Sequence, residues 1–265
     1  MLSIRSLFNR GKKPQRQQEV CYIHLEETDS TNRYCREELR EQLAGNAQPR
    51  LTVVTTEYQS AGKGQGSNTW ESERGRNLLF SVVCHPVWIP VTAQFLLSEC
   101  IALAIRDVLS KLTDGITIKW PNDIYYRDRK VCGILIENSL QGGHIKDCII
   151  GVGLDVNQTV FRGDAPNPMS LAQILGHEVD RERLLQDIVS RFDRYLRSSE
   201  SGLYGDIATL YQSYLYRQSG FYRYRDSYGE FEAALVEVED DGHLVLRDRA
   251  GRIRSYAFKE VEYII

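Results

Sequence analysis

The sequence predicts an α+β fold, with a mixed sheet flanked by helices and a small β domain at the C-terminal end. Before residue 160, several short runs alternate apolar and polar residues, as half-buried strands do. Residues 92–112 instead repeat their apolar side chains at nearly helical spacing, which predicts a core helix packed on a sheet. After Gly220 the chain changes to short strand-like runs separated by turns, which predicts a separate β domain.

Composition excludes several classes of protein. The 265 residues suffice for one large domain and one small one. With 42% hydrophobic and 26% charged residues, the chain is typical of soluble globular proteins. A net charge of −3 gives no polycationic character suited to nucleic acids, and no run approaches the roughly 18 apolar residues of a membrane span. We therefore expect a cytoplasmic protein that binds neither DNA nor membranes.

The cysteines and histidines indicate no metal site. Six cysteines are scattered without a Cys-x-x-Cys pair, and five histidines show no cluster with the spacing of metal ligands. Cys84 and Cys100 lie in apolar runs, which favours buried thiols in a reducing compartment. The sequence therefore predicts neither a disulfide framework nor a resident metal.

The first 18 residues differ from the rest of the chain because they carry five basic residues and no acidic one. Such a segment is typical of an organelle transit peptide or of a disordered basic tail, and we favour the tail. The expected division is a tail at residues 1–20, a main domain at 21–216 and the small β domain at 217–265.

Local patterns place the other elements. Residues 33–43 are rich in helix formers, with Ser30 or Thr31 as the capping hydroxyl. The small C-terminal domain, an SH3-like barrel of about 45 residues, is expected to dock on the main body because its own core is small. The remaining expected strands are Tyr22–Leu25, Leu51–Tyr58, Leu78–Val83, Phe221–Arg225, Glu230–Glu239, His243–Asp248 and Arg252–Phe258, and the remaining helices are Arg183–Arg197 and Leu203–Tyr216.

A hairpin is expected in the middle of the chain. Residues 116–120 alternate in polarity, and Pro121 has no N–H with which to continue a central strand. A second strand-like run, Val131–Glu137, follows a polar turn. The hairpin would present four polar side chains near one end, and on charge alone such a tip is more often an ordinary solvated turn. These side chains are Lys119, Asn122, Asp123 and Lys130.

Two segments are rich in glycine. Residues 59–70 hold three glycines in five residues around Lys63, a loop that can bring backbone N–H groups close to an anion but is weak evidence alone. The strand at 148–157 has one apolar face, whereas the other carries Gly151, Gly153, Asp155 and Asn157. Glycine weakens a sheet unless something must approach its backbone, so we expect this face to line a ligand cavity.

Four segments together resemble the biotin protein ligase family, in its non-regulatory form without a DNA-binding domain. The resemblance extends from Tyr22 to about Asn157, and the small β domain also fits the family plan, whose main domain has a class II synthetase-like fold. The Lys-Trp-Pro-Asn-Asp run is the most specific part. The four segments are Ser30-Thr31-Asn32, the loop from Glu57 to Ser81, Lys119–Asp123 with Lys130 and Gly133-Ile134, and Gly151–Asn157.

The resemblance implies a two-step reaction. The biotin carboxylate attacks the α-phosphate of ATP, bound with Mg²⁺, releases pyrophosphate and leaves biotinyl-adenylate. A lysine of a biotin carboxyl carrier protein, such as that of acetyl-CoA carboxylase, then attacks this mixed anhydride. Cations are needed where negative charge crowds, and a closing loop would keep water from the adenylate.

The resemblance also assigns residues. Lys130, Asp123 and Lys63 would be catalytic, with Asp123 orienting or deprotonating the acceptor lysine; its alternative role is to bond N–H groups of the turn. Biotin would be bound by Ser30, Thr31, Gln59, Gly62, Lys63, Lys130 and Gly133. ATP would be bound by Lys63, Gln65, Asn68, Trp70, Lys130, Asp155 and Asn157.

The sequence departs from the family pattern at several of these positions. Lys63 and Gln65 stand where arginines are usual, Asn68 replaces another arginine, and Asp155 replaces an asparagine. Lysine lacks the bidentate fork of arginine, and glutamine lacks its charge. We therefore expect this loop to hold the adenylate phosphate less tightly.

Alternatives remain. Lipoate or octanoate ligases share the fold, but their Arg-Arg-x-Ser-Gly-Gly-Gly signature is absent. A biotin-sensing repressor needs a helix-turn-helix, and too few residues precede Tyr22 for one. A biotin-binding module with weak catalysis is the third reading. The identity of the carrier, and whether the protein is a monomer or a homodimer, stay open.

Overall fold

The computed structural model describes residues 19–39, 48–66, 68–163 and 165–265. The chain forms two compact units, the first comprising Met1–Trp88 and Cys132–Glu182, the second Ile89–Val131 and Arg183–Ile265. The predicted basic tail lies, up to residue 18, outside the described residues. The predicted domain boundaries stay a prediction.

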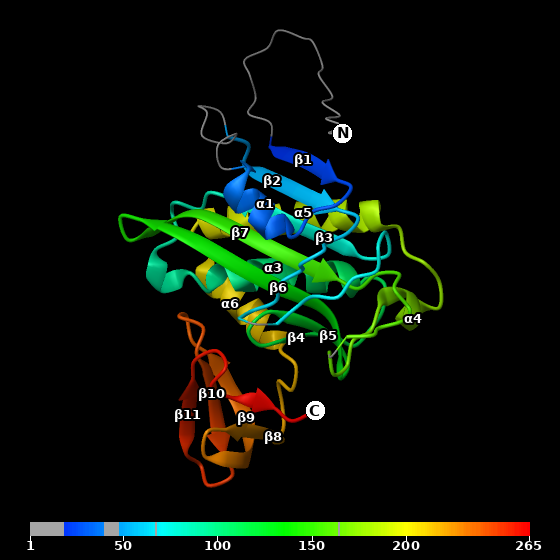
Figure 1. The fold of residues 1–265 in the computed structure, drawn as a ribbon. Coiled ribbons are helices and arrows are strands. Elements are labelled where there is room, and N and C mark those ends of the chain that lie inside the picture. The colour runs from blue at the N-terminus through cyan, green and yellow to red at the C-terminus, as the bar shows by residue number, and fades with distance from the viewer. Residues whose placement is uncertain (1–18, 40–47, 67, 164) are drawn as a thin grey trace. The chain divides into compact units, whose positions relative to one another are not determined.

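A mixed seven-stranded sheet has the order β1-β2-β3-β7-β6-β5-β4 (Figure 1). In the first unit β1 runs parallel to β2, whereas β2–β3, β3–β7 and β7–β6 are antiparallel. Every residue of β3 is buried, as expected for a central strand covered on both faces. The predicted mixed sheet is confirmed. The strands of this unit are β1 Val20–Leu25, β2 Leu51–Thr56, β3 Leu78–Cys84, β6 Arg129–Gln141 and β7 His144–Leu154.

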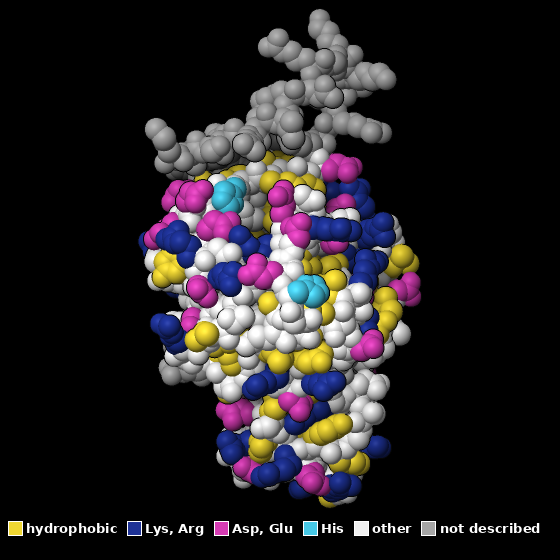
Figure 2. Space-filling view, turned by 90° about the vertical axis from the view of Figure 1, so that its right-hand side faces the viewer, with side chains coloured by type: hydrophobic (Ala, Val, Ile, Leu, Met, Phe, Trp, Pro, Cys, Tyr) yellow, Lys and Arg dark blue, Asp and Glu magenta, His cyan; other side chains and the backbone are white. Residues whose placement is uncertain are grey.

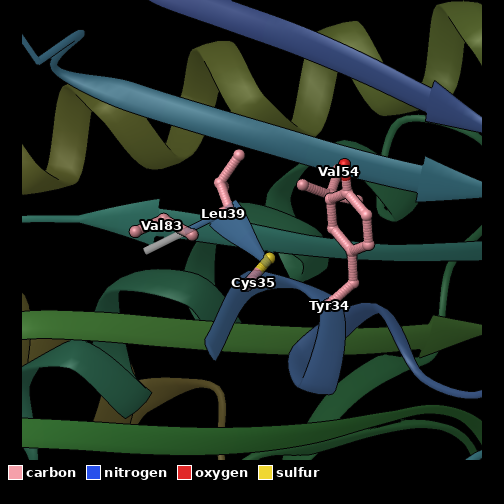
Figure 3. Close-up of a cluster of buried hydrophobic side chains, with 5 residues drawn as sticks. All are labelled: Tyr34, Cys35, Leu39, Val54 and Val83. Carbon is pink, nitrogen blue, oxygen red and sulfur yellow. The ribbon is translucent and has the colours of Figure 1, made fainter. Parts of the chain in front are cut away.

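Helix α1, Thr31–Glu37, packs on β2, β3 and β7 of the same unit. Its apolar side chains enter a buried cluster with strand residues (Figure 3); the cluster is Tyr34, Cys35, Leu39, Val54 and Val83. Ser30 occupies the N-cap position, but no side chain forms a capping hydrogen bond, so the predicted hydroxyl cap is wrong. The Thr31 hydroxyl instead faces Gln59 and Ser81. A short helix of this unit, α4 Leu171–Leu175, is capped by Ser170.

In the second unit, β4 (Ile116–Lys119) and β5 (Asp123–Tyr126) form a tight antiparallel hairpin. The expectation that 116–120 pairs with 131–137 is therefore wrong, because the aromatic and β-branched residues 124–126 form a strand of their own. The turn between β4 and β5 contains a cis Trp120–Pro121 peptide bond. Helix α3, Leu96–Leu109, packs on both strands and on α6, Tyr204–Ser213.

Helix α5, Arg181–Glu200, is joined to α3 within the second unit by the Tyr195 hydroxyl, which donates to Asp107 Oδ2 at 2.8 Å. Tyr211 of α6 donates its hydroxyl to the Pro121 carbonyl at 2.6 Å. These contacts join the helices to one another and to the turn after β4. Among the described residues, no helix is both long and apolar enough to cross a membrane.

The C-terminal strands form a five-stranded antiparallel sheet in the order β11-β10-β9-β8-β12, as predicted. Its β9–β10 turn packs against the central hairpin and α3 of its own unit. Trp120 Nε1 donates to the Gly242 carbonyl at 2.9 Å, and a Cβ at Gly242 would lie 2.5 Å from Phe95. The strands are β8 Tyr222–Asp226, β9 Gly229–Val238, β10 Leu244–Asp248, β11 Ile253–Tyr256 and β12 Glu262–Tyr263.

The charged side chains are of both signs and interspersed on the face shown in Figure 2. This distribution agrees with the small net charge of −3. That face therefore has no large electrostatic potential of one sign that would attract a highly charged partner.

Glu99 of α3 makes the stability of the second unit depend on pH. Its side chain is 5% exposed, and burial, followed by the nearby Asp240, raises its pKa to about 8. Between its ordinary pKa and about 8, the folded protein holds a proton that the unfolded chain releases. The free energy of unfolding therefore falls as pH rises through this window, by at most about 1.4 kcal/mol per pH unit.

Replacing Glu99 by glutamine should remove this dependence. We expect Glu99→Gln to gain stability over the wild type as pH rises from 5 to 9, measured by urea unfolding at each pH. Glu73→Gln, at an exposed position, is the control and should follow the wild type. A constant difference between Glu99→Gln and wild type across this range would contradict the assignment.

Candidate active site

Two segments of the first unit, one carrying Asn32 and the other Trp70, pack against the glycine face of β7. A Cβ at Gly151 would lie 2.3 Å from Asn32 Oδ1, and one at Gly153 would lie 2.3 Å from Trp70 Cε2. Any larger residue would push these side chains away. Gly133 of β6, another predicted ligand-binding residue, is paired with Gly153 in the ladder. The side chains of Asn32 and Trp70 thus make the close approach to the β7 backbone that the glycines predicted. A ligand cavity at this face stays a prediction.

A buried hydrogen-bond chain fixes Gln59. Gln59 Oε1 accepts from the Thr31 N–H at 2.8 Å, while Ser81 Oγ lies 2.7 Å from both Thr31 Oγ1 and Asn32 Oδ1. The Asn32 and Gln59 oxygens can only accept, so the Ser81 hydroxyl donates toward Asn32 Oδ1 and Thr31 Oγ1, and the Thr31 hydroxyl donates to Gln59 Oε1. Thr31 Oγ1 also lies 3.1 Å from Gln59 Oε1. The Gln59 Nε2 donor has no acceptor among the described residues and can bind a polar ligand.

Asn32 also joins α1 to β6. Its Nδ2 donates to Glu137 Oε2 at 2.8 Å, and Arg36 pairs with the other carboxylate oxygen at 2.8 Å. Sequence reasoning missed Glu137, although a carboxylate at the end of an apolar strand run was a usable signal. Ser30, 6% exposed, is next to this chain and makes no hydrogen bond through its hydroxyl within the described residues.

The glycine-rich loop is a hairpin rather than an open turn. Lys63 and Thr69 form an antiparallel bridge, and the Trp70 N–H donates to the Gly62 carbonyl at 2.9 Å. A Cβ at Gly62 would lie 2.7 Å from the Trp70 carbonyl, so this glycine allows the loop to close. The hairpin returns Trp70 to β7 and leaves its predicted ATP-binding side chains exposed, namely Lys63, Gln65 and Asn68.

Asp155 and Asn157 lie in a buried polar network. Asn77 Nδ2 donates to Asp155 Oδ1 at 3.1 Å; Asn77 lies in a segment of the family resemblance but was assigned no role. Asn157 uses both polar atoms of its side chain on the backbone of Val179, at 2.8 and 3.0 Å. Asp155 and Asn157, both predicted to bind ATP, therefore form hydrogen bonds within the protein. Their contact with the nucleotide stays a prediction.

In the second unit, the structure brings together two of the four polar side chains expected near the end of the central hairpin, Lys130 and Asp123. Lys130 Nζ lies 2.7 Å from Asp123 Oδ2, and Lys119 stands opposite Asp123 in the β4–β5 register. Lys119 Nζ lies 4.8 Å from the centre of the Tyr263 ring. Burial lowers the pKa of Lys119, Asp123 opposes this shift, and the neighbouring Lys130 adds to it. Lys130 is thus paired with Asp123, and Lys119 stands on the neighbouring strand.

A second charged cluster lies on the β9–β10 turn. Ligand atoms of Glu239, Asp241 and His243 lie within 4.8 Å of one another, which sequence spacing alone did not indicate. The two carboxylates are exposed and His243 is already bonded to Asp241 at 2.8 Å. Exposed groups of this kind are common without a metal ion, so we assign it no role.

Comparisons with known proteins agree on one family. Residues 25–155 match the model of the biotin/lipoate A/B protein ligase family. The biotin–[acetyl-CoA-carboxylase] ligase of Paracoccus denitrificans is 30% identical over 86% of this chain and 95% of its own length. The bifunctional ligase/repressor BirA of Bacillus subtilis is also 30% identical, over 82% of this chain and 67% of that protein.

Solved structures share the fold. The biotin protein ligase of Aquifex aeolicus, in complex with biotin and ATP, has a TM-score of 0.75 at 22% identity, covering 92% of this chain and 99% of its own. The biotin protein ligase of Leishmania major, in complex with biotinyl-5-AMP, has a TM-score of 0.59 at 22% identity, covering 90% and 98%.

Removing the Ser81 hydroxyl tests the buried hydrogen-bond chain. Ser81→Ala leaves Asn32 Oδ1 without its donor, so we expect a loss of about 1–3 kcal/mol in the free energy of unfolding. Urea denaturation measures it, with Ser198→Ala as control because that hydroxyl is on an exposed helix surface. If the Ser81→Ala protein were as stable as the control, the buried hydrogen bonds of Ser81 would not contribute to holding α1 in place.

Proposed function

Because the chain belongs to the biotin protein ligase family, we propose that it joins biotin to a lysine of a carrier protein, at the expense of ATP. The observation that carries the proposal is the joint placement of Asn32 and Trp70 against the β7 glycines, with Thr31, the neighbour of Asn32, bonded to Gln59. Biotin and ATP are the small substrates, and Mg²⁺ enters with ATP.

The ureido ring of biotin presents one carbonyl acceptor and two N–H donors. Gln59 Nε2 is oriented as a donor, since its oxygen is held by the Thr31 N–H. The hydroxyls of Ser30 and Thr31 supply further polar contacts. Gly133 carries no side chain, so the ligand can approach the backbone there. Gly62 would offer backbone groups only, because Trp70 takes the space that a side chain would fill. These contacts account for the proposed biotin-binding set.

ATP would lie against Trp70, whose indole is already seated on Gly153. The exposed Lys63, Gln65 and Asn68 stand on the same hairpin and can turn toward the phosphates. Asp155 and Asn157 would then act on the nucleotide through the rigid network that holds them, or after exchanging partners.

In the first step the biotin carboxylate oxygen forms a bond to the α-phosphorus, and the bond to pyrophosphate breaks. Repulsion between the carboxylate and the phosphates opposes this attack, so Lys130 and Lys63 would offset the charge. Lys130 is paired with Asp123 at 2.7 Å. A bound polyanion would compete for the lysine and leave the carboxylate of Asp123 available.

In the second step the acceptor lysine must lose a proton before it attacks. Asp123 would take that proton, the new amide bond would form at the biotin carbonyl, and AMP would leave. We propose a biotin carboxyl carrier protein as the acceptor, a monomer or homodimer as the working form, and the cytoplasm as the location.

Transfer of biotin to a carrier domain tests the function directly. With biotin, ATP and Mg²⁺, we expect the carrier to gain the mass of biotin, and Lys130→Ala to slow this by about a hundredfold or more. Lys146→Ala, at an exposed site on β7, is the matched control.

Pyrophosphate release separates the alternatives. Release with biotin but not with lipoate supports the proposal, whereas release with lipoate alone favours a lipoate ligase. Binding of biotin without either product would identify a binding module. Unfolding curves of both lysine variants exclude a loss of fold as the cause.

A further inference from the structure

Glu71 bonds the backbone of a distant segment of its own unit. Its carboxylate accepts from the Arg162 N–H, with oxygens at 2.9 and 3.1 Å, and from the Gly163 N–H at 2.5 Å. Two successive amides that point at one carboxylate form a small anion site, here filled by the protein's own side chain. The contact joins positions 91 and 92 residues apart.

Gly163 is suited to this contact because a Cβ there would lie 2.7 Å from Glu71 Oε2. The carboxylate therefore occupies the space that a larger residue would need. Among the described residues, Glu71 makes no bond to a basic side chain. Its bonds to Arg162 are to the amide and not to the guanidinium.

A second set of hydrogen bonds lies near those made by Glu71. Gln158 Oε1 accepts from Asn77 Nδ2 at 2.7 Å and from the Glu73 N–H at 2.9 Å. Residues 71–77 are thus bonded to residues 155–163 at both ends. Trp70 immediately precedes Glu71 and rests on Gly153, at the strand end from which the bonded segment leaves.

We propose that Glu71 is a positioning residue for the nucleotide: it holds residues 158–163 beside Trp70 before ATP arrives. This inference rests on the proposed function, because it takes Trp70 as a wall of the adenylate pocket. A segment that is already fastened loses little conformational freedom on binding, so ATP binds more tightly. The same fastening shields the mixed anhydride from water.

Three variants test the proposal. Glu71→Ala removes both bonds, Glu71→Gln keeps one uncharged acceptor oxygen, and Glu73→Ala is the control. Glu73 is exposed and only its backbone is bonded among the described residues. Hydrogen exchange of the Arg162 and Gly163 amides, measured without ligands, reports the fastening independently of activity.

We expect Glu71→Ala to speed exchange of these two amides roughly tenfold or more, and to raise the KM for ATP by a similar factor. The KM for biotin should stay at the wild-type value. Adenylate held without a carrier should hydrolyse faster in Glu71→Ala, with Glu71→Gln between the two proteins and Glu73→Ala like the wild type.

Unchanged amide exchange in Glu71→Ala would overturn the proposal, as would faster exchange with an unchanged KM for ATP. An equal rise in the KM for biotin would also overturn it, because that result indicates a general structural role. If the wild type formed no adenylate, the proposed function would fail and this inference with it, whereas the other outcomes leave the function intact.

Discussion

The described first unit depends on one constraint, the absence of side chains on one face of β7. Asn32 reaches Gly151, and the indole of Trp70 reaches Gly153, at separations that no Cβ would permit. Two segments far apart in sequence, the start of α1 and the end of the glycine-rich hairpin, therefore rest on the same strand. Each carries residues assigned to a different substrate, Thr31 to biotin and Trp70 to ATP. Strand β7 thus positions both segments, and with them the residues assigned to the two substrates.

The charged side chains at the end of the β4–β5 hairpin are partly paired with one another. Asp123 lies between Lys130, at 2.7 Å, and Lys119, opposite it in the hairpin. Half-buried ion pairs contribute little net stability, because desolvation opposes the attraction. In the proposed reaction the pair would supply a cation for the first step and a base for the second. Burial is the main cause of the lowered pKa of Lys119, because it disfavours the charged ammonium.

Much of the fold could be predicted because local patterns decide it. The central helix, the sheet strands and the C-terminal β domain follow from periodicity and turns. Strand β5 was missed because residues 124–126 are few and stand between two turns. The hydroxyl cap of α1 was wrong because Thr31 bonds across the sheet to Gln59 and Ser81, a choice that local sequence does not encode.

The site was predictable only where a motif marked it. Lys130 and Asp123 were expected to meet, and they do. Asn77, Glu137 and Glu71 were assigned no role, since each acts through a partner at least 78 residues away. Such contacts form only when the chain folds, and a single sequence shows each residue without showing which distant residue it contacts. The glycines at 151 and 153 were the exception, because their cost in a strand is itself a signal.

Titration of ATP against pyrophosphate release in Gly153→Ala tests the central claim most directly. A methyl group at this position must displace Trp70, so the KM for ATP should rise roughly tenfold while the KM for biotin stays near the wild-type value. An unchanged KM for ATP in a folded Gly153→Ala protein would contradict the account, because Trp70 would then not need the bare strand on which it rests.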